Sequence, residues 1–135
     1  MDITTLTKLQ DYINEETYHA RVYEALSKVA PSEASRNILA DLTNDENKHV
    51  NMLSSIVKDD IGRDYKPQIG PVFVTASSYR DLLKKQILQE ITAFRNFERD
   101  FDREEDDSRL KDAYREIKTD ALVFITNLLY LLEEE

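Results

Sequence analysis

Four long segments of this chain repeat their apolar residues every three or four positions, which is the period of an amphipathic α-helix. They span about residues 3–29, 33–61, 78–103 and 108–132. Only 2 Gly and 3 Pro occur in 135 residues, so few residues could interrupt these segments. Because Gly and Pro are unfavourable within helices, whereas β proteins need many turns, the pattern predicts an all-α fold with four helices.

Capping signals mark the expected helix ends. Asp2 and Ser32 stand where the N-caps of the first two segments would be, and Gly62 stands where the second would stop. Ser78 opens the third segment with Asp81 three residues later, which is the spacing of a capping box. We therefore expect the helices to begin and end close to these residues.

The connections between the segments are short, apart from the stretch of about residues 62–77, which has no helical period. Short turns make the first and second helices an antiparallel hairpin, and likewise the third and fourth. The long stretch can cross the molecule so that the third helix starts at the other end. This predicts a one-crossover four-helix bundle in a single domain, residues 1–135. A simple up-down-up-down bundle with one loose loop is the alternative.

Charge and hydropathy narrow the possible partners and locations. The net charge of −9 disfavours nucleic acid and anionic membranes, which both need a basic surface. The longest apolar stretch, residues 121–132, is too short to cross a bilayer, and residues 1–4 lack the basic start of a secretion signal. With no Cys, disulfides and thiolate metal sites are excluded. We therefore expect a cytoplasmic protein.

Three of the four apolar stripes carry a carboxylate near mid-helix, namely Glu16, Glu46 and Glu90, and His49 follows Glu46 by one turn. No Lys or Arg lies on these stripes, and burying an unpaired carboxylate costs on the order of several kcal/mol. A divalent cation would neutralise them, and Glu with neutral His suits Fe, Mn or Zn better than Mg or Ca. The pattern predicts a metal site formed by Glu16, Glu46, His49 and Glu90.

Two other polar residues lie at the edge of this pattern. His19 follows Glu16 by three residues, but it reaches the site only if the first helix is rotated slightly, and a place on the flank or surface is the favoured interpretation. Asp120 lies off the centre of its stripe and has a short side chain, so we expect it outside the site. A metal-free alternative for the four inward residues is a remnant cluster held by hydrogen bonds and shared protons.

The inward pattern resembles the rubrerythrin-type branch of the ferritin-like superfamily over nearly the whole chain. Tyr23 follows Glu16 by seven residues, and Phe97 follows Glu90 by the same distance. Glu46 lies thirty residues after Glu16 and begins the ExxH motif that ends at His49. The resemblance implies a ferritin-like four-helix bundle and a homodimer. It also implies a di-iron centre of four carboxylates and two histidines, which family members use with peroxide, dioxygen or ferrous iron.

The fourth segment departs from the family pattern. The family contains two similar hairpins, so an internal repeat is expected. Placing residues 41–49 over residues 116–124 sets Ala121 on Glu46 and Phe124 on His49, so the second ExxH motif is degenerate. The CxxC motif of a rubredoxin-like electron donor is missing too. We therefore expect no complete di-iron centre and no organic cofactor, and the electron donor is unknown.

Two functions are consistent with these residues. The first is a divergent rubrerythrin-like protein with at most one metal ion per site and an iron-handling or peroxide-related oxidoreductase role. The alternative is a non-enzymatic dimeric scaffold with a vestigial metal site. Apolar residues on the fourth helix outside its inward stripe predict a homodimer packed partly through that helix; they are Val123, Ile125, Leu129 and Tyr130.

Overall fold

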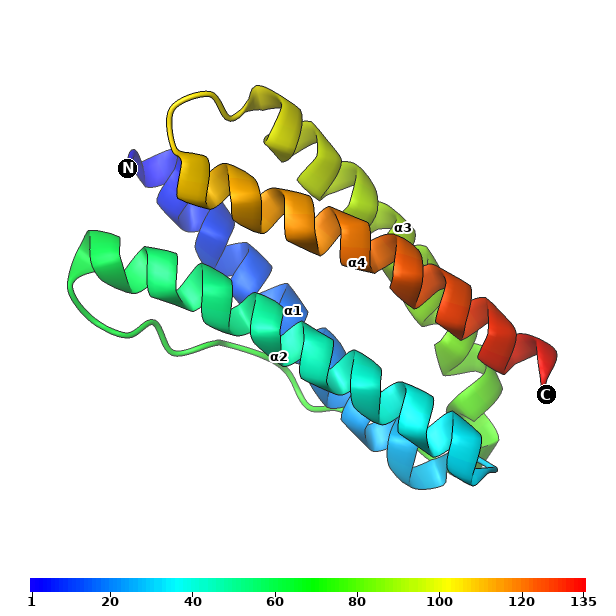
Figure 1. The fold of residues 1–135 in the computed structure, drawn as a ribbon. Coiled ribbons are helices and arrows are strands. Elements are labelled where there is room, and N and C mark those ends of the chain that lie inside the picture. The colour runs from blue at the N-terminus through cyan, green and yellow to red at the C-terminus, as the bar shows by residue number, and fades with distance from the viewer.

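The computed structural model describes residues 1–135 as four long helices and no strand (Figure 1). The helices are α1 (Ile3–Val29), α2 (Glu33–Ile61), α3 (Tyr79–Arg103) and α4 (Ser108–Glu133), and a 3-10 turn, η1 (Ala76–Ser78), precedes α3. The prediction of an all-α bundle is confirmed. None of these helices is both long enough and apolar enough to span a membrane.

Local side-chain caps explain where α1 and α2 begin and where α2 ends. The Asp2 carboxylate accepts from the backbone N–H of Thr5 at 2.7 Å, and the Ser32 hydroxyl accepts from the N–H of Ser35 at 3.0 Å. Gly62 adopts a left-handed φ of 76° and donates its N–H to the carbonyl of Lys58. Glycine is favoured at such a position because it has no Cβ to clash. These three predicted caps are confirmed.

The predicted capping box of α3 is wrong. Ser78 already has near-helical backbone angles, so its hydroxyl does not cap α3. It belongs instead to the preceding 3-10 turn, where it accepts from the N–H of Thr75 at 2.9 Å and donates to the Thr75 carbonyl at 3.0 Å. The Ser78 side chain, which was predicted to cap α3, therefore stabilises the short turn η1 instead.

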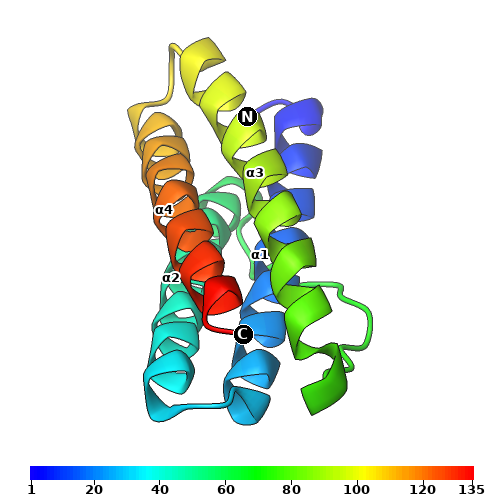
Figure 2. The ribbon, with the colours of Figure 1, turned by 90° about the vertical axis from the view of Figure 1, so that its right-hand side faces the viewer.

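The helices lie in two pairs, α1 along α2 and α3 along α4, and the pairs meet through α2 with α4 and α1 with α3. The connection after α2 runs back along the length of the molecule, so α3 starts at the end where α2 begins (Figure 1). Figure 2 shows this connection on the side of α1 and α3, away from α4. One side chain of α1 holds this connection. Asn14 Oδ1 accepts from the Tyr65 hydroxyl at 3.0 Å and from the backbone N–H of Gln68 at 2.8 Å.

The apolar core is divided into two clusters, and a layer of buried polar side chains lies between them. One cluster includes Leu9, Ile13, Leu53, Phe97, Leu110 and Ile117. The other includes Tyr23, Leu26, Leu39, Leu83, Phe124 and Leu128. The polar layer falls near the middle of α1, α2 and α3, so the fold places side chains from facing helices at one depth.

Candidate metal centre

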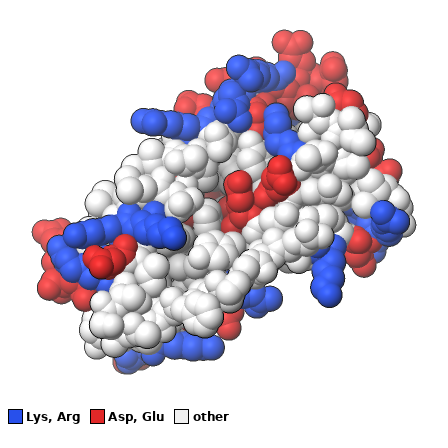
Figure 3. Space-filling model, turned by 180° about the vertical axis from the view of Figure 1, so that it is seen from behind, with Lys and Arg blue, Asp and Glu red and all other residues white.

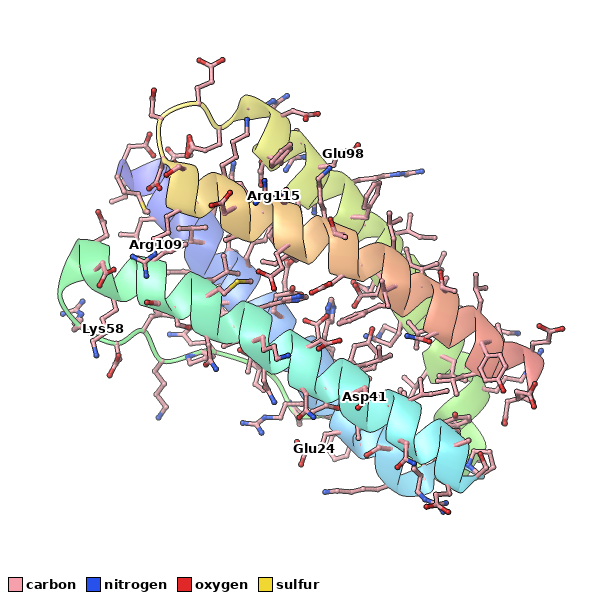
Figure 4. The ribbon with its side chains drawn as sticks, in the orientation of Figure 1. Glu24, Asp41, Lys58, Glu98, Arg109 and Arg115 are labelled. Atoms are coloured by element: carbon pink, nitrogen blue, oxygen red, sulfur yellow. The ribbon has the colours of Figure 1, made fainter.

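The polar layer contains five ionisable side chains, and none is more than 6% exposed: Glu16 and His19 from α1, Glu46 and His49 from α2, and Glu90 from α3. Figure 4 shows polar side chains between the helices at mid-bundle, whereas the labelled Glu24 and Lys58 point outward. The helical period explains the convergence, because residues three or four apart share one face of a helix.

His49 lies between carboxylates from three helices. Its Nδ1 is 3.1 Å from Glu16 Oε1 and 3.7 Å from Glu46 Oε2. Its Nε2 is 2.7 Å from Oδ2 of Asp120, on α4. The N–H at Nε2 donates to Asp120, so the ring is held with Nδ1 directed toward Glu16 and Glu46.

His19 occupies the other side of Glu16. Its Nδ1 is 3.5 Å from Glu16 Oε2 and 3.6 Å from Glu90 Oε1, and it has no hydrogen-bond partner. Glu46 Oε2 has none either. One ligand atom from each of Glu16, His19 and Glu46 can be chosen so that all three lie within 4.8 Å of one another. This buried group could hold a metal ion.

Aromatic side chains form the wall of the centre. The Tyr23 hydroxyl donates to Glu90 Oε1 at 2.8 Å. Phe124 packs edge-on against Tyr23 and is stacked on His49, with ring centroids 5.8 and 5.9 Å apart. The phenyl ring thus fills space at the position where the family resemblance expects a second ligating histidine.

The structure corrects two expectations about residues near the centre. His19 is buried rather than on the flank, because the buried face of α1 is wide enough to include Tyr12, His19 and Tyr23 together. Asp120 contacts the centre although its side chain is 32% exposed, since His49 Nε2 approaches the edge of α4. Four carboxylates and two imidazoles therefore gather here, more than the three and one counted from the sequence.

No Lys or Arg forms an ion pair with Glu16, Glu46 or Glu90, and their only basic neighbours are histidines. Burial would raise the pKa of Glu16, but the neighbouring His19 and His49 imidazoles lower it to about 2. Burial and the charge of Glu16 raise the pKa of Glu90 to about 7, and they raise that of Glu46 well above its usual value. Glu46 and Glu90 thus keep a proton at pH values where an ordinary glutamate is ionised, whereas Glu16 stays ionised.

The imidazoles respond to these carboxylates in the opposite sense. Burial would lower the pKa of His49, but its carboxylate neighbours, Asp120 first, raise it to about 12. Burial is likewise outweighed at His19, whose pKa is raised by Glu16 and Glu90. Burial and the charges of Glu90 and Glu46 raise the pKa of Tyr23 well above its usual value. Protons therefore balance the charge of the metal-free cluster, and a cation that binds there must displace some of them.

Asp100 on α3 is a buried carboxylate of a different kind, which the sequence did not single out. Its oxygens accept from Lys8 Nζ at 3.2 Å, from Arg99 Nε at 3.4 Å and from the Tyr12 hydroxyl. Asp100 thus has cations of the chain as partners, which the three glutamates of the centre lack.

The chain matches no family model, no curated protein and no solved structure. Its function is therefore inferred from the geometry of the centre.

Proposed function

We propose that the chain binds a divalent first-row transition ion with Glu16, His19 and Glu46. The observation that carries the proposal is the pair of buried, unpartnered ligand atoms, His19 Nδ1 and Glu46 Oε2, beside an ionised Glu16. A buried polar atom without a partner costs about 1–3 kcal/mol, and an ion between these atoms would remove that cost. Mixed carboxylate and imidazole donors favour Fe, Mn or Zn.

His49 and Glu90 are placed to complete the coordination. His49 directs Nδ1 at Glu16 and Glu46, while its Nε2–H donates to Asp120. A carboxylate on the far nitrogen of a ligating histidine fixes the tautomer and the ring orientation. Glu90 lies beyond His19 and is oriented by Tyr23, so it would serve as a further ligand or as a hydrogen-bond acceptor next to the ion.

We further propose that the chain is a divergent ferritin-like, rubrerythrin-type protein with an iron-handling or peroxide-related oxidoreductase role. The inward glutamates of α1, α2 and α3 and the long connection between two helix pairs support it. Ala121 and Phe124 on α4 supply no ligand, which favours one ion over a complete di-iron centre. The cytoplasmic location remains a prediction from the sequence.

The homodimer is also a proposal, and α4 supports it. Leu122, Val123, Leu129 and Tyr130 on this helix are each about half exposed. Ile125, which the sequence grouped with them, packs partly against the core. An apolar strip of this kind on one helix is suited to packing against a second copy.

A non-enzymatic scaffold with a vestigial site is the second candidate. It is favoured by the hydrogen bonds that satisfy much of the cluster without an ion, from His49 to Glu16 and Asp120 and from Tyr23 to Glu90. In this case the buried charges are balanced by protons alone.

Metal titration separates the two candidates. Metal-free protein is incubated with Fe²⁺ without oxygen, with Mn²⁺ or with Zn²⁺, desalted, and analysed for bound metal. We expect about one ion per chain for at least one metal, and a loss of at least tenfold in affinity when Glu46 or His19 is replaced by Ala. Glu24→Ala, at the surface, is the matched control. Less than about a tenth of an equivalent for every metal would favour the scaffold.

A further inference from the structure

A surface hollow of about 330 Å³ lies between α1, α3 and residues 68–70 of the connection. Figure 3 shows the face on which these elements lie, with a few acidic side chains near the middle of a largely uncharged surface. The hydrogen bonds from Tyr65 and Gln68 to Asn14 hold the connection over this part of α1. The hollow therefore has a fixed wall rather than a loose loop on that side.

His19 belongs both to this hollow and to the candidate metal centre. It lines the hollow and is 6% exposed, and its Nδ1 lies 3.5 Å from Glu16 Oε2 and 3.6 Å from Glu90 Oε1. No other hollow described on the molecule includes a residue of the Glu16–His19–Glu46 group. The imidazole thus stands between solvent and the other two ligands.

Gln86 is the second buried residue that lines the hollow. It is 1% exposed, and its amide nitrogen has no hydrogen-bond partner. It precedes Glu90 by four residues on α3, so the two side chains share one face of the helix. A buried N–H without an acceptor is unfavourable, so this amide is suited to a ligand that brings an acceptor atom.

We propose that the hollow is the entrance of the metal centre, and that the Gln86 amide N–H binds a small ligand of a few atoms, with an acceptor oxygen or nitrogen, beside the ion. The inference rests on the proposed metal binding. The ligand must be small, because the two residues that line the hollow on the side of the core, His19 and Gln86, are both nearly buried. Gln86 is in this account a positioning and specificity residue.

Azide binding to Co²⁺-loaded protein tests the inference, because the visible absorption of Co²⁺ reports a new ligand. Gln86→Leu removes the donor at similar size, and half-buried Gln10 on α1 offers the control Gln10→Leu. We expect Gln86→Leu to bind as much Co²⁺ as wild type but azide three- to tenfold more weakly, roughly the effect of one hydrogen bond. The control is expected to keep wild-type azide affinity.

A substitution at the mouth of the hollow gives a second test, which remains valid even if the buried substitution Gln86→Leu disturbs folding. Gln89 lines the hollow and is exposed, so Gln89→Trp is expected to slow azide binding in stopped flow, whereas Lys84→Trp, outside the hollow on α3, is not. If Gln86→Leu kept the wild-type azide affinity and Gln89→Trp kept the wild-type rate of azide binding, the inference about the hollow would be overturned, while the proposed metal site would stand. Protein that binds no Co²⁺ would refute the proposed metal site together with it.

Discussion

Two buried carboxylates in this bundle have opposite surroundings. Asp100 accepts hydrogen bonds from Lys8, Arg99 and Tyr12, whereas Glu46 keeps one oxygen without any partner. The charge of a buried carboxylate that is paired with cations of the chain is already balanced, but a carboxylate without them needs a proton or an external cation. This contrast is why we assign a ligand-binding role to Glu46 and a structural role to Asp100.

Metal-free protein should lose stability as pH rises from about 5 to 7. The folded state raises the pKa of Glu90 from 4.5 to about 7, so its stabilising contribution is complete below 4.5 and is lost as pH rises through 7. The raised pKa values of Glu46, His19 and His49 act in the same direction, and the contribution of Glu16, whose pKa is lowered to about 2, is already constant above 4.5. Glu90 alone should lower the free energy of unfolding by about 2 kcal/mol over this range.

Urea unfolding at several pH values measures this slope. Gln at position 90 cannot titrate, so Glu90→Gln should make the dependence between pH 5 and 7 less steep, with Glu46 and His19 accounting for the slope that remains. Glu24→Gln on the surface should leave the slope as in wild type. An equal slope in wild type and Glu90→Gln would show that Glu90 does not control the pH dependence.

At the scale of elements, local signals proved sufficient for some helix ends and not for others. Asp2, Ser32 and Gly62 act on atoms within four residues, so the sequence alone predicted their roles. Ser78 was misassigned because its hydroxyl serves the preceding turn, whose shape depends also on Thr75. Capping motifs are thus dependable only where no second turn competes for the same side chain.

The candidate site, like the helix ends, was predictable only in part from the sequence. Glu16, Glu46, His49 and Glu90 follow from the helical period, because a polar residue on an apolar stripe must face the core. His19 could not be placed, since its burial depends on how α1 is rotated against α3, which only tertiary packing determines. The Glu16-x-x-His19 spacing was the one available signal.

The end of α2 provides a test of backbone conformation. Gly62 has a φ of 76°, and a Cβ at this position would meet no other atom within 4 Å. Gly62→Ala should therefore cost about 1 kcal/mol of stability through backbone strain alone. Gly70 also has open space around it but no positive φ, so Gly70→Ala should be neutral or slightly stabilising. Thermal or urea unfolding compares the two, and equal effects would contradict the role assigned to Gly62.

At the scale of the whole molecule, the apolar strip on α4 predicts association. We expect wild type to sediment as a dimer and Leu129→Lys to sediment as a monomer, because a charge within the strip opposes its burial. Leu88→Lys on α3, where the side chain is 66% exposed, is the matched control and should remain dimeric. A monomeric wild type at high concentration would contradict the proposed dimer.

The most direct test of the proposed centre is anomalous diffraction from crystals of Zn²⁺-loaded protein. The account predicts one strong peak at mid-bundle, about 2.0–2.2 Å from His19 and from oxygens of Glu16 and Glu46. A peak only at surface carboxylates, or no peak in the core despite ordered side chains, would contradict it.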